Sequence, residues 1–135
     1  MAFRHGRLAS LSVAGTVLQA YLDNAALNVT NSTADTTTFG STWTTAIAGL
    51  LGGTLSGSGF YDPTASTGPQ EVLWTAFTGG ASVAFIYYPG GNTASQRSYT
   101  FNGIVTSMSE QATATDKVTF TFDVLVTGAV TPATI

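Results

Sequence analysis

The side chains that could do chemistry are few, and the only histidine stands near the start of the chain. His5 lies beside Arg4 and Arg7, and a general base at that place would need an ordered shell of residues around it. The Ser-Gly-Ser-Gly run at 56–59 does not match the Gly-x-Ser-x-Gly pattern of a nucleophile elbow. A Ser-His-Asp arrangement would therefore depend entirely on His5, which we interpret as a solvated or interface-packed residue.

The seven carboxylates do not form a catalytic or metal-binding set. Asp116 and Asp123 are seven residues apart on one expected strand, so their side chains would project from opposite faces and could not act as a glycosidase pair. Asp35 and Asp62 lie where turns use Asp, without the cluster of oxygen ligands that calcium requires. The chain has no cysteine, which excludes disulfides and cysteine-ligated zinc. We expect no enzyme, no cofactor and no metal.

The composition argues against a domain that binds nucleic acid. Of 135 residues, 24 are Thr and 12 are Ser, whereas only 8% are charged and the net charge is −3. Four Lys and Arg residues cannot form the basic stripe of a nucleic-acid-binding domain. Thr favours strands, and no apolar stretch reaches the ~18 residues of a membrane helix. Because a surface of threonine rather than charge is colloidally weak, we expect much of it to be buried against copies of the same chain.

Alternation and turn residues predict six to eight strands and one helix. Pro69 suits the first helical position, and Gly79-Gly80 ends a helix over 69–78 whose apolar face includes Leu73 and Phe77. A single helical turn is expected over 19–23. Strands are expected over residues 8–13, 16–18, 26–31, 50–61, 82–88, 97–108 and 117–127.

The last of these strands alternates most strictly, which predicts one face on a core and one on a more polar environment. The core face comprises Val118, Phe120, Phe122, Val124 and Val126. The opposite face comprises Lys117, Thr119, Thr121, Asp123, Leu125 and Thr127.

Residues 32–46 are polar and lack a clean period, so we interpret them as a long loop that carries the two aromatics Phe39 and Trp43. Long loops in compact domains are usually functional. The terminal segments 1–7 and 129–135 are expected to be arms. Together these features predict a single mainly β domain over 1–135, a two-sheet β-sandwich or small barrel with one flanking helix.

The order of several segments resembles a known family. Examples are Met-Ala-Phe-Arg-His-Gly at 1–6, Asp-Thr-Thr-Thr-Phe-Gly at 35–40 and Leu-Ser-Gly-Ser-Gly-Phe-Tyr-Asp at 55–62. Further segments lie at 19–22, 47–50, 102–109, 117–122 and 127–128. In this order they resemble the tail tube, or major tail, proteins of long-tailed, non-contractile bacteriophages, although the chain carries fewer charges than expected for that family.

The resemblance implies a structural virion protein. Six copies would form a ring whose inner sheets join into one continuous barrel, and stacked rings would form a tube that conducts DNA during ejection. Its partners would be itself, tape-measure proteins, tail terminator and initiator proteins, and genome DNA that passes without specific binding. The protein would be located in the virion tail after assembly in the bacterial cytoplasm, with no membrane partner.

Two sets of residues are the candidate sites. The loop and the arms are expected to contact other subunits, chiefly between rings, through Phe3, Arg4, His5, Asp35, Phe39 and Trp43. A DNA conduit must not grip phosphates, so we expect a neutral to acidic lumen lined by Thr119, Thr121 and Asp123. The alternative for the lumen is the strand over 97–108.

Two other functions stay open at this point. A capsid decoration protein, or another phage structural protein, would form trimers or capsid-bound monomers rather than stacked rings. A secreted carbohydrate- or cell-binding β-sandwich would need a signal peptide and aromatic side chains exposed on one face.

Overall fold

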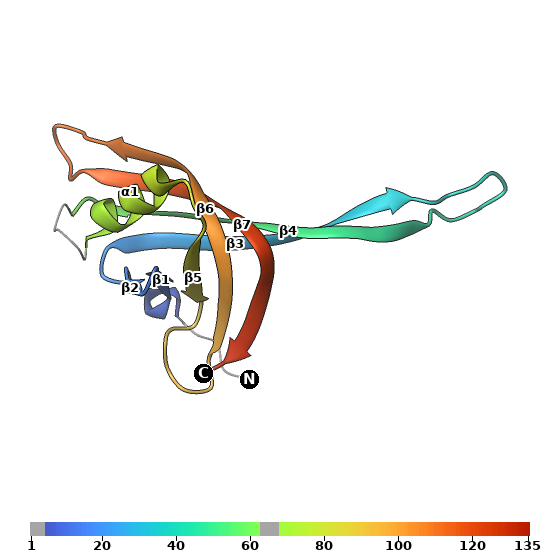
Figure 1. The fold of residues 1–135 in the computed structure, drawn as a ribbon, viewed down its shortest axis with the longest axis horizontal. Coiled ribbons are helices and arrows are strands. Elements are labelled where there is room, and N and C mark those ends of the chain that lie inside the picture. Colours follow the sequence, from blue (N-terminus) through green and yellow to red (C-terminus); the bar gives the residue numbers. More distant parts are fainter. Residues whose placement is uncertain (1–4, 63–67) are drawn as a thin grey trace.

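The computed structural model describes residues 5–62 and 68–135. The expected contacts of Phe3 and Arg4 therefore lie outside the described residues. A short 3-10 helix (Gly6–Leu8) precedes the first strand, and the remaining elements are shown in Figure 1. They are β1 (Ser10–Val13), β2 (Thr16–Val17), β3 (Leu22–Asp35), β4 (Ala46–Phe60), α1 (Pro69–Gly79), β5 (Val83–Tyr88), β6 (Arg97–Gln111) and β7 (Thr119–Thr134).

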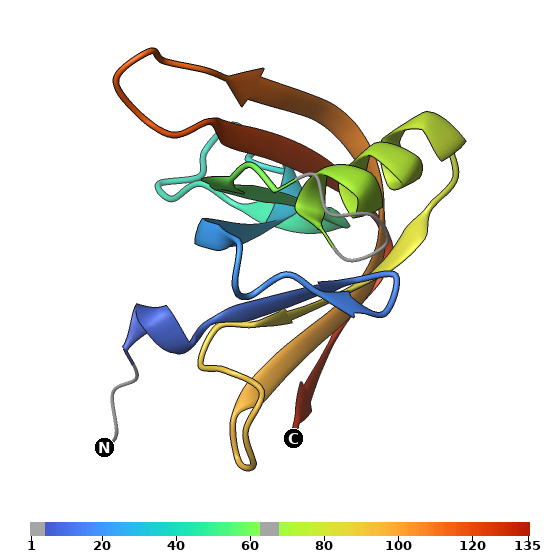
Figure 2. The same ribbon diagram turned by 90° about the vertical axis from the view of Figure 1, so that its left-hand side faces the viewer.

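All seven strands belong to one antiparallel sheet in the order β2-β1-β5-β6-β7-β4-β3. The mainly β class with one helix is confirmed, but the two expected sheets are one. β6 pairs with β5 through residues 99–103, and its later residues have β7 alone as a described strand partner. Register shifts between Thr100 and Asn102 and between Val105 and Ser107 let β6 and β7 curve. The two halves of the sheet thereby face each other across a core (Figures 1 and 2).

The core lies between these halves and is built largely from aromatic side chains. The Phe85 ring on β5 stacks on Phe101 of β6 with centroids 5.5 Å apart. Phe120 and Phe122 of β7 are each about 1% exposed, so the core face predicted for the last strand is confirmed. Gly57 of β4 makes room for this packing, because a Cβ there would lie 2.8 Å from the Phe122 ring.

The helix α1 has the predicted ends and packs against β6. Pro69 occupies its first turn after Gly68 as N-cap, and Gly80 closes it in the left-handed region at φ 67°. Leu73 and Ala76 are buried. Phe77, which was placed on the same apolar face, is instead partly exposed beside Trp74.

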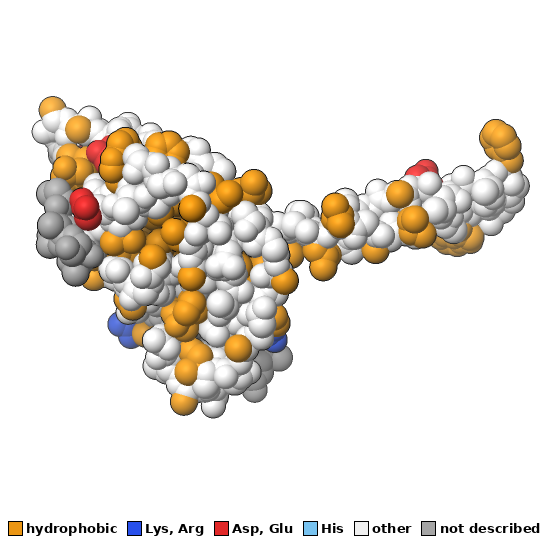
Figure 3. Space-filling model, in the orientation of Figure 1, with side chains coloured by type: hydrophobic (Ala, Val, Ile, Leu, Met, Phe, Trp, Pro, Cys, Tyr) orange, Lys and Arg blue, Asp and Glu red, His pale blue; other side chains and the backbone are white. Residues whose placement is uncertain are grey.

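The segment predicted as a loop over 32–46 is mostly the outer part of a hairpin. β3 continues to Asp35 and β4 begins at Ala46, with Asp35 opposite Ala46, so that residues 36–45 alone form the turn. This hairpin extends far from the rest of the molecule (Figures 1 and 3). A register shift between Asn31 and Thr33 breaks the period-two pattern, which is why the sequence suggested a loop. We call residues 29–53 the arm.

Two other local predictions were wrong. Residues 19–21 form a turn, with Tyr21 N donating to Leu18 O at 3.1 Å, and a strand begins at Leu22 in place of a helical turn. The expected terminal arm over 129–135 continues β7 as far as Thr134, paired with β6. Gly128 and Pro132 suggested a break, but β7 pairs with β4 only through residues 119–125. Pro132 therefore lies where β7 has a neighbour on one side, and such an edge position tolerates its missing N–H.

Candidate functional site

The titratable side chains of the described residues form no catalytic or metal-binding group. No three His, Cys, Asp or Glu side chains of this part of the chain lie together. His5 Nδ1 accepts a hydrogen bond from the Arg7 backbone N at 3.1 Å and so caps the 3-10 helix. The surfaces of the described residues offer two other candidate sites.

Within the described ranges, no helix combines the length and the apolar character needed to cross a membrane.

Four strand segments form one half of the curved sheet, which we call the four-strand sheet. They are residues 22–28 of β3, 54–60 of β4, 119–125 of β7 and 104–111 of β6. One face of this sheet lies on the core. The side chains that alternate with the core residues form the opposite face, which we call the hydroxyl face. Its members include Asn24, Asn28, Thr54, Ser56, Ser58, Ser107, Ser109, Thr119, Thr121 and Asp123.

The hydroxyl face brings the three predicted lumen residues, Thr119, Thr121 and Asp123, onto one polar surface. Its carboxylates accept hydrogen bonds from neighbouring strands. Ser107 Oγ donates to Asp123 Oδ2 at 2.9 Å, and Ser58 Oγ donates to Asp23 Oδ1 at 2.8 Å.

One cation lies at the end of the hydroxyl face. Lys117 Nζ is 4.4 Å from the centre of the Phe60 ring, a distance at which a cation is attracted to the aromatic face. Phe60 pairs with Thr119 across β4 and β7. This positive charge therefore stands at the rim, not in the middle of the face.

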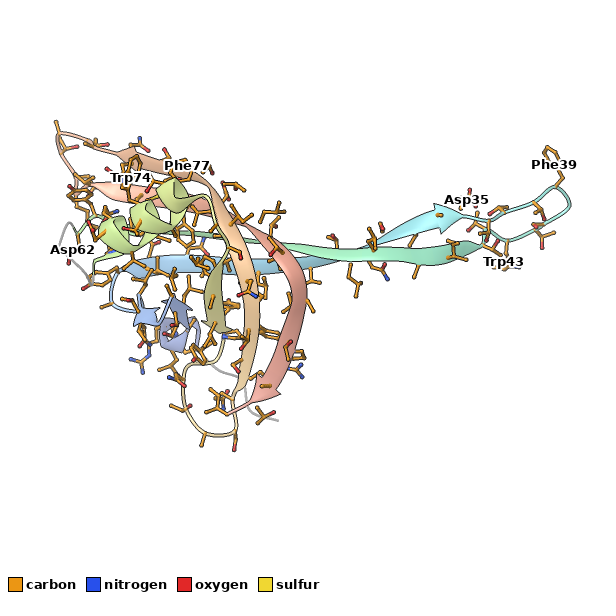
Figure 4. The ribbon with its side chains drawn as sticks, in the orientation of Figure 1. Asp35, Phe39, Trp43, Asp62, Trp74 and Phe77 are labelled. Carbon is orange, nitrogen blue, oxygen red and sulfur yellow. The ribbon has the colours of Figure 1, made fainter. Side chains whose placement is uncertain are left out.

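The arm displays apolar side chains that make few contacts within the chain. Phe39 and Trp43 lie in its terminal turn (Figure 4), and Trp43 is 84% exposed. Ile47, Leu50 and Leu51 lie along β4 of the arm and are also exposed. Exposed apolar surface of this extent is typical of a protein–protein contact.

Hydrogen bonds among small polar side chains order the terminal turn. Asp35 Oδ1 accepts from Thr37 N at 2.8 Å, Thr45 N donates to Thr37 Oγ1 at 2.9 Å, and the hydroxyls of Thr36 and Thr45 are 2.8 Å apart. The bonds from Thr37 lower the pKa of the Asp35 carboxyl from its ordinary value. These polar side chains therefore have hydrogen-bond partners within the turn, whereas the Phe39 and Trp43 side chains are exposed.

Sequence reasoning placed Asp35, Phe39 and Trp43 together, and the arm brings them to one end. It did not identify Ile47, Leu50 and Leu51 as exposed apolar residues; the strand was expected to begin only at residue 50, whereas β4 begins at Ala46. It also missed the open strand edges. The outer edges of β3 over 22–28 and of β6 over 104–111 have no strand partner among the described residues.

The sequence matches no protein-family model and no curated protein. Its structure, however, resembles solved structures of tail particles. A chain of a native gene transfer agent virion superposes with a TM-score of 0.81 at 15% identity, covering 97% of this chain and 99% of that chain. A chain from the tail of the empty particle, determined with C6 symmetry, gives a TM-score of 0.78 at 17% identity, with coverages of 96% and 98%.

The SPP1 tail tube gives a TM-score of 0.79 at 8% identity, covering 98% of this chain and 80% of that chain. This chain has a tail-tube fold. A chain of the sheath–tube complex of the PVC contractile injection system also matches, with a TM-score of 0.72 at 9% identity and coverages of 98% and 93%. The tail-tube fold is therefore shared with chains from both tail and contractile particles.

Proposed function

We propose that this protein is the structural subunit of a phage tail tube, in which six copies form a ring and stacked rings conduct DNA during ejection. The tail-tube fold supports this proposal, and so does the C6 symmetry of the matching gene transfer agent tail. The observation that carries it is the four-strand sheet with two open edges. Such edges are normally covered, because exposed strands pair with other chains.

The directions of the two open edges fit closure into a ring. Because all neighbouring strands are antiparallel, β3 and β6 at the two edges also run in opposite directions. The β6 edge of one copy can therefore pair with the β3 edge of the next copy and continue the antiparallel order. Six copies of this four-strand sheet would form a barrel of 24 strands. With strands ~4.8 Å apart and tilted by ~40°, its backbone would be about 50 Å across, which is wide enough for a DNA duplex after side chains are added.

The hydroxyl face would line this barrel, because the other face of the four-strand sheet is the core. Thr119, Thr121 and Asp123 would then face the DNA. Serine and threonine hydroxyls and a few carboxylates give phosphates no cationic partner, so they add no counterion-release affinity. Six Lys117 side chains would form a positive rim at one end.

The arm would connect rings. Its terminal turn lies far from the four-strand sheet (Figure 1), and Phe39 and Trp43 are exposed there. An aromatic side chain that enters a neighbouring subunit is the usual energetic anchor of an interface. The same contact repeated from ring to ring is heterologous and generates a filament.

The remaining parts of the proposal follow from this role. Tape-measure, terminator and initiator proteins would be the further partners, the virion tail the location, and the bacterial cytoplasm the place of assembly. We assign the protein to non-contractile tails because the sequence resembles that family.

Electron microscopy of the concentrated purified protein tests this proposal. We expect hollow tubes with six-fold end views. A protein that stays monomeric or trimeric at all concentrations, with and without tail initiator proteins, would contradict a tube subunit and favour a capsid decoration protein.

A further inference from the structure

We infer that Arg7 of one copy forms an ion pair with Glu110 of the next copy across the seam between their four-strand sheets. This inference rests on the proposed ring. It names the groove that receives the neighbour and the charge that fixes its position, neither of which follows from the fold alone.

The receiving groove borders the open edge of β3. It has a volume of about 520 Å³ and lies between residues 22–25 of β3 and the segment that begins at Gly6. Arg7, Gln19, Tyr87 and Pro89 line its other sides. The two ends of the curved sheet approach each other here, since Tyr87 Oη donates a hydrogen bond to Ala25 O at 3.3 Å. A strand that joined the β3 edge would pass along this groove.

The segment proposed to join that edge, residues 104–111 of β6, carries one charged residue, Glu110. In the cross-strand register Glu110 stands opposite Phe120, whose side chain is in the core. The Glu110 side chain therefore belongs to the core side of the four-strand sheet, not to the hydroxyl face. Arg7 lines the groove together with Leu22 and Ala25 of the core side of β3 and with Asn24 of the hydroxyl face, so it lies at the seam itself.

The register relates Glu110 to a residue that lines the groove. Leu22 pairs with Gly59, Gly59 with Phe120, and Phe120 with Glu110. Leu22 and Glu110 are thus the two ends of one cross-strand row. A strand tilt of ~40° displaces each copy along the seam by about 16 Å, or about five residues, relative to this row. The Glu110 of the neighbour then lies within about five residues of Leu22 along β3, and the groove covers residues 22–25.

Among residues 5–62 and 68–135, neither Arg7 nor Glu110 forms an ion pair within the chain. Asp23 lines the same groove but accepts a hydrogen bond from Ser58. Asp116, the other acid near the end of the β6–β7 hairpin, accepts from Lys117 N at 2.8 Å and serves its own turn. In a chain with eleven charged side chains, one ion pair at a seam of hydroxyls would fix the register of the neighbour more than it would add affinity.

Chemical cross-linking tests the proximity of the two residues. The chain contains no cysteine, so the double variant Arg7→Cys/Glu110→Cys has two thiols and no background. A short bismaleimide is added to tubes of this variant and the products are separated under denaturing conditions. We expect a ladder of covalent oligomers that ends at six, and no ladder from Arg97→Cys/Glu71→Cys. Tubes that form normally but give no ladder would overturn the inference and leave the proposed function intact.

Charge exchange tests whether the contact is ionic. We expect Arg7→Glu or Glu110→Arg to raise the protein concentration needed for tube formation ~10-fold or more, because like charges then meet at the seam. The double variant Arg7→Glu/Glu110→Arg should restore assembly to within ~3-fold of the original protein. Rescue of Arg7→Glu by Asp116→Arg instead would overturn the pairing, and failure of the unchanged protein to form any tube would overturn the proposed function itself.

Discussion

At the scale of single residues, the two tryptophans are both exposed but have different surroundings. Trp74 lies on α1 with its ring centre 5.7 Å from that of Phe77. Trp43 lies in the terminal turn of the arm, where the side-chain hydrogen bonds join Asp35, Thr36, Thr37, Thr38, Ser41 and Thr45 and none involves Trp43. A large aromatic side chain with few contacts within its own chain stabilises the monomer little, so its contribution should come from a neighbouring ring.

The substitution Trp43→Ala should therefore separate assembly from folding. We expect the melting temperature of the monomer to stay unchanged, because the side chain is 84% exposed. Tube formation should weaken by about 2 kcal/mol or more for each lost contact, as for a buried aromatic anchor. Circular dichroism measures the first quantity and tube length in micrographs the second. Trp74→Ala is the matched control, and tubes of normal length from Trp43→Ala would contradict the role given to the arm.

Gly57 shows why β4 is rich in glycine. A methyl group at this position would lie 2.8 Å from the Phe122 ring and 3.0 Å from Asn24 O. Gly52 has no heavy atom within 4 Å of the same position. Glycine is thus required at position 57, because the Phe122 ring and the Asn24 backbone approach it closely. At position 52 there is room for a side chain.

We expect Gly57→Ala to lower the free energy of unfolding by about 1–3 kcal/mol, which is typical of overpacking in a core. Gly52→Ala should change the free energy by less than about 1 kcal/mol, because it adds a methyl group in open space. Urea titration of the two variants gives the comparison. Equal stability of the two would show that the Phe122 ring moves aside without cost.

At the scale of the elements, the arm follows from chain length. The 15 residues of β4 span about 50 Å when extended, whereas a compact domain of this size is about 36 Å across. β4 therefore cannot lie entirely within the body. This estimate was available from the sequence once residues 46–60 were known to be one strand. The sequence did not show that each strand continues into the arm. The register shift after Asn31 interrupts the period-two pattern, and both faces of the arm are exposed, so no buried side imposes an alternation of apolar and polar residues.

The elements that bury one face were the ones the sequence predicted well. The helix from Pro69 and the alternation through Phe120 and Phe122 each have one buried side. The end of β7 was missed because Gly128 and Pro132 are ordinary strand breakers. They are tolerated where β7 has one neighbour, and the position of a strand in its sheet is not a local property of the sequence.

The terminal turn of the arm should depend on pH through Asp35. The hydrogen bonds from Thr37 lower the pKa of this carboxyl from its ordinary value, because they favour the carboxylate over the protonated form. Their contribution is present above the pKa of the unfolded chain and is lost as the pH falls through the lower folded pKa. We expect the Thr37 amide resonance in an NMR titration to shift with a midpoint lower than that of Asp35 in the unfolded chain. A midpoint at or above that of the unfolded chain would show that the bond does not favour the carboxylate.

At the scale of the whole molecule, the assembly surfaces were predictable only in part. Aromatic residues in a polar segment identified Phe39 and Trp43 as candidates. Arg7 and Glu110 carry no such signal, because their pairing depends on two strand edges that are far apart in the chain and meet only between copies. A single sequence does not show which strand edges lack a partner within the chain. The strand order of the sheet was needed to identify them.

The charge of the hydroxyl face should control how freely DNA moves in the proposed tube. Six copies carrying −3 each sum to −18 per ring, and the hydroxyl face presents carboxylates with Lys117 at its rim. A cation in the middle of this face would meet phosphates in every ring. Each phosphate contact adds affinity that does not depend on sequence and that weakens with salt.

We therefore expect Asp123→Lys/Thr121→Lys to leave tubes intact and to slow DNA ejection, most strongly at low salt, where screening is weakest. Both positions are exposed on the hydroxyl face, and only the hydrogen bond from Ser107 is lost. The matched control is Glu71→Lys/Thr75→Lys, which makes the same charge change at two exposed positions of α1. Ejection is followed by the release of labelled DNA from phage carrying each variant over a range of salt concentrations. If the Asp123 variant and the control eject DNA at the same rate at every salt concentration, the hydroxyl face does not line the channel, and β6 residues 97–103 become the alternative lining.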